Sequence, residues 1–418
     1  MNQPADESAP NGEAAAGTSA DDGLAPGDDV PEAESPDVES PEAGSPESGS
    51  PEVGDQPPPL RSVHTSNLPE MFEQGGFSLL VTTYQAGKLV LLRNDKGVLN
   101  THFRNFHKPM GLAVTGGKLA IGCNIDIWEF HNVPAVCKKL DESDENQGNT
   151  FTHDACFLPR RSHTTGDVQV HEMAWVDGEL WFVNTAFSCL ATRCDLNSFQ
   201  PRWRPTFVTE LVPGDSCHLN GLAMRDGRIR YVTALGETNT PGGWRDNKRD
   251  GGLLIDVDTD EIITRGLSMP HSPRWYRDQL WVLESGNGGF GTIDIATGQY
   301  QEIAQLPGFT RGLSFLGPLA FIGLSQVRES AVFSGIPLVE RLEERTCGVW
   351  VINIETGQTV AFCRFEDAVQ EIFSVELLHG CRFPDLVNHD AELIGRSYVL
   401  DDKALADVPA DLRADRPG

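Results

Sequence analysis

The chain of 418 residues lacks several features that would place it in a familiar class of proteins. It has no run of 18 apolar residues, so we expect no membrane-spanning helix. Its nine cysteines are odd in number and form no Cys-x-x-Cys pair, which favours buried, reduced thiols over a disulfide framework. The N-terminus has neither the basic segment nor the apolar segment of a signal peptide. Together these absences predict a cytoplasmic protein.

Basic residues are scarce. Lys and Arg number 33 against 61 Asp and Glu, which gives a formal net charge of −28. Residues 1–60 carry −15 of that charge, and the rest of the chain carries −13. Sequence-independent binding to nucleic acid requires a basic face, and so does binding to an anionic membrane surface. We therefore expect neither a nucleic-acid partner nor a membrane partner.

Residues 1–60 contain no Lys, Arg or aromatic residue, but 15 acidic residues and 11 prolines. A Ser-Pro-acid phrase repeats there every five residues, at Pro36, Pro41, Pro46 and Pro51. Such a segment cannot bury enough apolar surface to offset the entropy lost on ordering the chain. We predict that it is a disordered, solubilising tail, and a tail that binds a protein partner is the alternative.

What the chain does contain is a repeated phrase of a polar cluster, a short apolar strand, a turn and a second strand. Asp215–Met224 is its clearest copy, with Gly221, Leu222 and Ala223 at its centre. Aligned on that glycine, the copies fall at positions 111, 172, 221, 273, 312 and 371. The intervals of 39 to 61 residues fit four-stranded propeller blades of about 40–50 residues that carry loop insertions.

The repeat predicts an all-β fold, a single six- or seven-bladed β-propeller over residues 61–390. A pair of β-sandwiches is the structural alternative, and the period argues against it. The number of blades stays open, because residues 77–104 form either a whole blade or part of a closing blade with the C-terminal strands. Residues 391–418 are polar, and we predict a loosely attached tail.

Three long insertions interrupt the period: His131–Gln169, Gly236–Gly251 and Ser325–Thr346. Loops of this length in a compact domain are usually functional or disordered. The last two are rich in Gly, Trp and Arg, which is not the composition of a disordered linker. We therefore predict that they are ordered lids.

The chain resembles an uncharacterised bacterial family of conserved hypothetical proteins with a domain of unknown function and a predicted propeller fold. The resemblance covers about residues 60–390 and implies the propeller fold, but no activity and no catalytic residue. The segments that carry it include His171–Trp175, Asn184–Phe187, Cys217–Leu222, Tyr231–Gly236, Gly242–Arg245, Leu267–Arg274, Pro307–Gly312 and Gly323–Ser325.

In a propeller the first strand of each blade lines the central channel, so the residues that open these strands converge at one mouth. Arginines there would suit an anionic ligand through bidentate pairing. The predicted ligand-binding residues are His171, His218, Asn220, His271, Arg274, Arg311 and Glu371, together with Trp244 and Arg245 from the second insertion. The alternative for any of these histidines is a structural role, because buried polar groups generally find partners within the protein.

Three histidines and a carboxylate could also hold a divalent metal, the possible cofactor here, since neutral His and Glu are common ligands of zinc and iron. The candidate ligands are His171, His218, His271 and Glu172. Their register differs, however, and a shift of one residue turns a strand side chain to the opposite face. On this pattern we expect Asn220, rather than His218, to face the channel.

Other candidates are weaker. His153 and Asp154 with Cys156 have the residue types of a metal site or a nucleophile pair, but a loop histidine is more often solvated. Trp175, Trp181, Trp275, Trp281 and Trp350 lie in strand patterns, and we expect them to pack between blades. The chain has no Gly-rich phosphate loop after a strand, no Gly-x-Ser-x-Gly elbow and no His-Glu-x-x-His motif.

Three functions fit this sequence, and propellers serve them all. The first, a module that binds a small anionic molecule, a glycan or a peptide at the channel mouth, asks for the fewest coincidences of geometry. The alternative is a metal-dependent enzyme, either a lactonase-like hydrolase or a lyase, that uses an activated water. The third is a protein–protein interaction scaffold, which would need no convergent cluster of His and Arg. Whether the chain is an enzyme stays open.

Overall fold

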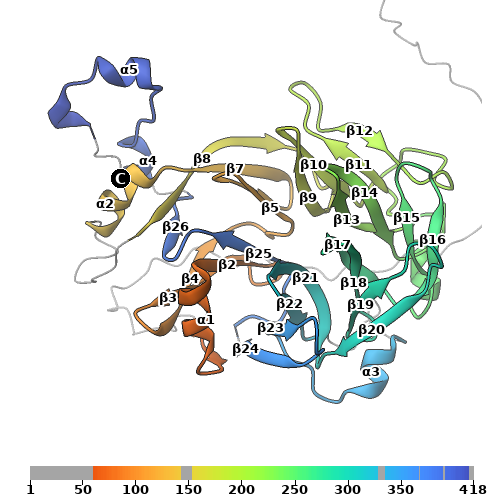
Figure 1. Cartoon of the computed structure of the whole chain (residues 1–418). Helices are drawn as coiled ribbons and strands as arrows, with labels where there is room; N and C mark the ends of the chain where they lie inside the picture. The colour runs from red at the N-terminus through yellow and green to blue at the C-terminus, as the bar shows by residue number, and fades with distance from the viewer. Residues whose placement is uncertain (1–59, 143–152, 328–334, 367, 389–390, 414–418) are drawn as a thin grey trace, which may run out of the picture. The chain divides into compact units, whose positions relative to one another are not determined.

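The structure, a computed structural model, describes residues 60–142, 153–327, 335–366, 368–388 and 391–413. In this part of the chain six sheets follow one another around a common centre (Figure 1). The prediction of an all-β propeller is confirmed, and the number of blades is six. Except for its last residue, the acidic tail predicted over residues 1–60 lies outside the described residues.

Three blades are built from four consecutive strands each. The first strand of each blade lies at the centre of the ring, and the next three follow outwards through hairpins. These strands are β9 (Val170–Val176), β10 (Glu179–Asn184), β11 (Cys189–Thr192) and β12 (Gln200–Trp203); β13 (Leu219–Arg225), β14 (Arg228–Ala234), β15 (Gly252–Asp256) and β16 (Ile262–Leu267); and β17 (Pro270–Tyr276), β18 (Gln279–Glu284), β19 (Gly289–Ile293) and β20 (Tyr300–Gln305).

Two blades carry a fifth strand at the outer edge. β1 (Ser62–His64) pairs antiparallel with β24, and β26 (Pro384–Leu386) pairs parallel with β8. The other strands of these blades are β5 (Leu112–Thr115), β6 (Lys118–Gly122), β7 (Asp126–Asn132) and β8 (Ala155–Thr164); and β21 (Phe309–Leu316), β22 (Leu319–Ser325), β23 (Gly348–Asn353) and β24 (Thr359–Phe365).

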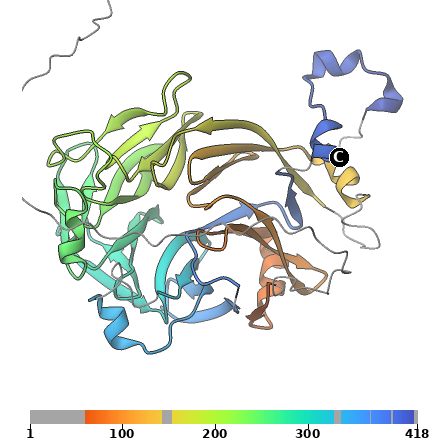
Figure 2. The same ribbon diagram turned by 180° about the vertical axis from the view of Figure 1, so that it is seen from behind.

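The sixth blade joins the two ends of the domain. Its inner strand is β25 (Ser374–His379), and its outer strands are β2 (Phe77–Thr83), β3 (Lys88–Asp95) and β4 (Val98–Asn105). β25 pairs antiparallel along the whole of β2. Figure 1 and Figure 2 both show this C-terminal strand beside the N-terminal ones. Residues 77–104 therefore belong to a closing blade, which settles the number of blades that the sequence left open.

Short hairpins connect the inner strands to their neighbours. Asp177-Gly178 joins β9 to β10, and Asp226-Gly227 joins β13 to β14, with positive φ at all four residues. Two successive residues with positive φ make the type I′ turn, whose twist matches that of the flanking strands. The predicted turns are thus the ones that set the register of each blade.

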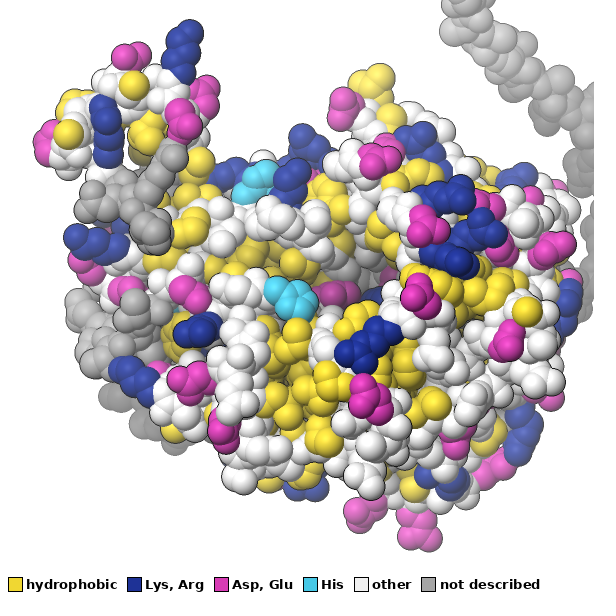
Figure 3. All heavy atoms as spheres, in the orientation of Figure 1, with side chains coloured by type: hydrophobic (Ala, Val, Ile, Leu, Met, Phe, Trp, Pro, Cys, Tyr) yellow, Lys and Arg dark blue, Asp and Glu magenta, His cyan; other side chains and the backbone are white. Residues whose placement is uncertain are grey.

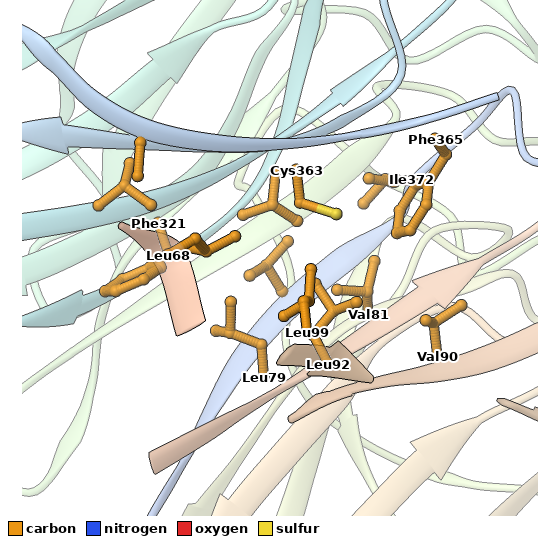
Figure 4. Packing of buried hydrophobic residues seen from close by; sticks show 14 of the residues in the cluster. Leu68, Leu79, Val81, Val90, Leu92, Leu99, Phe321, Cys363, Phe365 and Ile372 are labelled. Atoms are coloured by element: carbon orange, nitrogen blue, oxygen red, sulfur yellow. The ribbon is translucent and has the colours of Figure 1, made fainter. Parts of the chain in front are cut away.

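The described residues form eight hydrophobic core clusters, and six of them lie one between each pair of neighbouring blades. Figure 4 shows the cluster between the β25 and β21 blades, where Leu79 and Val81 meet Phe321 and Cys363. Because the closing blade packs on both of its neighbours, the ring has no open face. Trp281 and Trp350 are buried in one of these clusters, and Trp175, Trp181 and Trp275 pack at the margins of others, as predicted.

Helices are few and short in the described residues: α1 (Leu68–Gly75), α2 (Cys137–Asp141), α3 (Pro337–Arg341), α4 (Ala391–Gly395) and α5 (Asp402–Ala406). None of them is long and apolar enough to cross a membrane. The predicted C-terminal tail is not uniformly detached, because Leu393 and Ile394 of α4 pack against a cluster that includes Leu140 and Leu158.

The described parts of the second and third insertions are ordered and packed together. Trp244, in a 3-10 turn over Gly243–Asn247, shares a cluster with Ile336 and Leu338 from the third insertion. An ion pair between Arg249 and Glu340 also joins the two, with both N···O distances at 2.9 Å. Of the third insertion, residues 328–334 lie outside the described residues.

Candidate functional site

One pocket of about 310 Å³ lies where the inner strands of all six blades begin. Its position is the channel mouth at which the sequence predicts that polar residues converge. It is lined by Tyr84, Met110, Gln169, His171, Asp215, His218, Trp244, Arg245, Met269, His271, Phe309, Arg311, Glu371 and Phe373.

A larger open hollow of about 650 Å³ lies beside Thr346 and Arg364. Its lining comes from a single blade, and it borders stretches outside the described residues. We therefore take the channel-mouth pocket as the candidate site. On the face shown in Figure 3, Lys and Arg side chains are interspersed with Asp and Glu, without a broad basic patch.

Seven of the nine predicted ligand-binding residues line the channel-mouth pocket. They come from five blades and from the second insertion, and so are brought together only by ring closure. These residues are His171, His218, Trp244, Arg245, His271, Arg311 and Glu371. The other two, Asn220 and Arg274, lie elsewhere.

A left-handed residue stands directly before three of the inner strands. These residues are Gln169 (φ 53°), His218 (φ 49°) and Met269 (φ 47°), which precede β9, β13 and β17. Non-glycine residues adopt this conformation at a cost, and such residues concentrate at functional sites. All three line the pocket. In a regular strand, alternation would turn some of these side chains away from the pocket. The left-handed conformation reverses the backbone locally and directs them into it.

His171 and His271 are held by the same set of contacts. Nδ1 of His171 lies 3.0 Å from Gln169 O and 2.8 Å from Thr185 Oγ1. Nδ1 of His271 lies 2.9 Å from Met269 O and 3.0 Å from Ser285 Oγ. A carbonyl oxygen only accepts, so Nδ1 carries the proton in both rings. The two hydroxyls in turn donate to Leu219 O and Thr310 O.

Both imidazoles are neutral near pH 7. Burial lowers the pKa of His171 well below its usual value, and the charges of His218 and Arg311 act in the same direction. Burial also lowers the pKa of His271 well below its usual value, again with Arg311 and His218 contributing. With Nδ1 protonated, each ring keeps a bare Nε2 that can only accept a hydrogen bond.

Asp215 is the centre of a second group in the pocket wall. His218 Nδ1 lies 3.0 Å from each of its carboxylate oxygens, and Trp244 Nε1 donates to Oδ2 at 2.9 Å. Arg245 reaches the same oxygen at 3.4 Å and stacks on the Trp244 ring. Trp244, predicted to bind a ligand, lines the pocket and also anchors its loop by packing in the cluster with Ile336 and Leu338.

Arg311 is a positively charged group of the pocket that no carboxylate in the described part of the chain contacts directly. Its guanidinium carbon lies 3.8 Å from the centre of the Phe373 ring. Among the described residues it makes no hydrogen bond and no ion pair, although Glu371 also lines the pocket and its charge acts to raise the pKa of Arg311. Burial lowers the pKa of Arg311 to about 10, so the group stays protonated at neutral pH.

The expectation that Asn220 rather than His218 faces the channel is wrong. Asn220 is 1% exposed, donates to Pro270 O and accepts from Thr233 Oγ1. Both the nitrogen and the oxygen of its side-chain amide are therefore hydrogen-bonded within the wall of the ring. His218 lines the pocket because its positive φ breaks the strand alternation on which the expectation depended.

Arg274 and Glu172 do not belong to the pocket either. Arg274 Nη1 lies 3.0 Å from both carboxylate oxygens of Glu172, and Nη2 lies 3.4 Å from Glu376. Glu172 also accepts from the Leu222 amide. Burial raises the pKa of Glu376 to about 7, although Arg274 acts in the opposite direction. This group ties three inner strands, β9, β17 and β25, across the channel.

The predicted metal ligands do not assemble into a metal site. Glu172 is paired with Arg274, and His171 and His271 each donate from Nδ1 to a backbone carbonyl. No group of three or more His, Cys, Asp or Glu in the described residues has a geometry that could hold a metal ion.

His153 is buried, so the expectation that it is solvated is wrong. Its Nδ1 lies 2.5 Å from Asp141 Oδ1, and its Nε2 lies 3.6 Å from Asp385, which is 1% exposed. Asp154 caps the chain at Arg382 and Phe383 by accepting from both amides. The Cys156 thiol has its pKa raised by burial, which makes it a poor nucleophile.

Several pocket residues were not predicted. Asp215 stands in the opening phrase of its blade but was not assigned to the site, and Gln169 and Met269 precede strands two residues before a histidine. That spacing, shared by two blades, is the signal that could have indicated them. The apolar walls Phe309 and Phe373 give no signal that distinguishes them from core residues.

A family model described as a domain of unknown function (DUF4915) matches residues 66–387. The chain belongs to the DUF4915 family. No curated protein is significantly similar to it. The match spans the DUF4915 propeller from α1 to the end of β26, leaving out only the edge strand β1, and includes every residue that lines the pocket.

Solved structures resemble this DUF4915 chain only distantly. A chain of the nidogen/laminin complex has 10% identity and a TM-score of 0.46, and the match covers 73% of this chain and 99% of that one. A protein of unknown function from Bacteroides caccae has 11% identity and a TM-score of 0.43, covering 72% and 98%. Streptogramin B lyase has 13% identity and a TM-score of 0.34, covering 68% and 74%. Similarity this low indicates nothing about ligand or activity.

Proposed function

We propose that the protein binds a small organic anion in the channel-mouth pocket. The observation that carries the proposal is Arg311, a protonated guanidinium in a pocket of about 310 Å³ without a hydrogen bond or ion pair in the described part of the chain. A charged group removed from water is costly unless it is paired. A carboxylate or a similar anion would supply the missing partner through two parallel hydrogen bonds.

The rest of the pocket supports a small molecule rather than an extended polymer. Its walls include the rings of Phe309, Phe373 and Trp244, and ligand sites typically combine such apolar walls with a few convergent polar groups.

All nine cysteines are free thiols, and seven of them are buried. These thiols support a further part of the proposal, that the protein works in a reducing, cytoplasmic compartment.

Thermal shift measurements with a panel of mono- and dicarboxylates, phosphate, sulfate and a neutral disaccharide test the proposal. We expect at least one anion, and not the neutral sugar, to raise the melting temperature. The Arg311→Gln variant should bind that anion about 10- to 100-fold more weakly, because a hydrogen bond to a charged group is lost. Arg277, an exposed residue paired with Glu355, gives the matched control Arg277→Gln, which should bind like the unmodified protein.

Two results would contradict the proposal. One is a panel in which no anion shifts the melting temperature at millimolar concentration. The other is an Arg311→Gln variant that binds as tightly as the Arg277→Gln control, since the anion would then lie elsewhere.

A further inference from the structure

His171 and His271 present two equivalent hydrogen-bond acceptors to the channel-mouth pocket. They come from different blades, β9 and β17, yet each is fixed through Nδ1 by a left-handed residue two positions earlier and by a hydroxyl from the residue directly after the following strand. A second hydrogen bond from each hydroxyl fixes its direction. The contacts therefore specify the tautomer as well as the position of both rings.

Among the residues that the structure describes, neither Nε2 atom has a hydrogen-bond partner. Nε2 of His171 is buried without a hydrogen bond, on a side chain that is only 5% exposed. His271 is 4% exposed, and its described contacts all involve Nδ1 or the ring face packed against Phe309. Leaving a buried polar atom unsatisfied costs about 1–3 kcal/mol. The buried Nε2 of His171, with the Nε2 of His271 also lacking a hydrogen bond in the described part of the chain, points to a ligand that donates to these atoms.

These acceptors lie beside the unpaired cation. Arg311 stacks on Phe373, whose ring centre lies 4.9 Å from that of His171. The Arg311 charge also acts on His271. The Arg311 guanidinium, a donor, and the two histidine Nε2 atoms, both acceptors, therefore lie close together in the pocket. A small ligand with two adjacent functional groups can contact both kinds of group.

We infer that the ligand is a small carboxylic acid with a hydroxyl or N–H donor on an atom near the carboxylate. The carboxylate pairs with Arg311, and the donor bonds to Nε2 of His171 or His271. Phosphate and sulfate lack a neighbouring donor on an apolar body and fit less well. This inference rests on the proposed function and narrows it to one class of ligand.

Matched pairs of acids test the inference, each pair differing in the donor: lactate and propionate, mandelate and phenylacetate, and N-acetylphenylalanine and 3-phenylpropionate. The third pair represents a peptide C-terminus, and the first two represent free hydroxy acids. By titration calorimetry at pH 7.5, we expect the donor-bearing acid of at least one pair to bind about 10-fold or more tightly than its partner. The pair that shows it identifies the source of the ligand.

Variants separate an acceptor role from a structural one. His171→Phe and His271→Phe keep the ring volume but remove Nε2. At least one of them should abolish the advantage of the donor-bearing acid while leaving the affinity for the donor-free acid unchanged. Retained binding of the donor-free acid shows that the variant is folded and that Arg311 is in place. His107→Phe, at an exposed position outside the pocket, should keep the advantage.

Different results would overturn the donor requirement and the anion-binding function on which it rests. Equal affinities within all three pairs, with binding still dependent on Arg311, would overturn the donor requirement and leave the anion site standing. A donor advantage that survives in both histidine variants would overturn the assignment of the acceptors. If no acid of any pair binds, and the anion panel is also negative, both the function and the inference are wrong.

Discussion

Single backbone conformations decide which side chains enter the pocket. Val170, Leu219 and Pro270 begin equivalent inner strands, and the residue before each has positive φ. The second residue of each strand is then His171, Asn220 or His271. The two histidines reach the pocket, whereas the shorter Asn220 bonds within the wall. A strand pattern in the sequence carries no information on φ, so the choice between His218 and Asn220 could not be predicted.

The buried histidines make the fold sensitive to acid. Folding lowers the pKa of His171 and His271 below 6.5, so below that pH the unfolded chain binds more protons than the folded one. The stability that the two neutral histidines contribute is therefore complete above pH 6.5 and decreases as the pH falls below it. Each could cost up to about 1.4 kcal/mol per pH unit. Urea unfolding between pH 5 and 8 should show this loss, and His171→Asn, which copies the residue of the β13 blade, should reduce it.

The control for this effect is the exposed His107→Asn variant, which should keep the full pH dependence of the unmodified protein. Superimposable stability curves for His171→Asn and the unmodified protein across the whole range would show that this histidine is not held neutral by the fold.

At the scale of elements, the edge strand β26 is held by a buried carboxylate. Asp385 accepts two hydrogen bonds from Arg104 at 3.0 and 3.2 Å and lies 3.3 Å from His102 Nε2. These contacts and His153 hold the pKa of Asp385 well below its usual value, although burial alone would raise it. They connect β26 to β4 of the neighbouring blade, so the carboxylate ties the C-terminal strand to two blades at once.

Removing that carboxylate should be costly. We expect Asp385→Ala to destabilise the protein by about 3–5 kcal/mol, because it leaves buried positive charge without its partner. Glu340→Ala, which breaks the exposed pair with Arg249, should cost no more than about 1 kcal/mol. Denaturant unfolding at pH 7 measures both, and equal losses for the two variants would refute a special role of Asp385.

For the whole molecule, the sequence predicts that the blades exist better than it predicts how many there are and how the ring closes. Each inner strand shows the repeated phrase, because every blade must pack its apolar strand in the same way against a neighbour. The number of blades depends instead on a contact between Ser374 and Thr82, which are 292 residues apart. No local pattern reports such a pairing, and the same is true of Arg274 with Glu172, whose pairing removes both from the predicted site.

Ring closure should be indispensable. A chain ending at Phe373 lacks β25, so the sixth blade loses its inner strand and the clusters on both sides of it are exposed. We expect this chain to lose cooperative thermal unfolding and near-ultraviolet circular dichroism. A chain ending at Asn388 retains all six blades and should keep both signals. Cooperative unfolding of the shorter chain would show that the pairing of β25 with β2 does not close the fold.

The central claim is that Arg311 at the channel mouth binds the carboxylate of a small organic acid. A crystal structure of the protein with the tightest-binding acid from the matched pairs tests it most directly. We predict that the carboxylate lies within hydrogen-bond distance of the Arg311 guanidinium, with the ligand body between Phe373 and Trp244. An acid bound outside this pocket, or bound in it with Arg311 still unpaired, would contradict the claim.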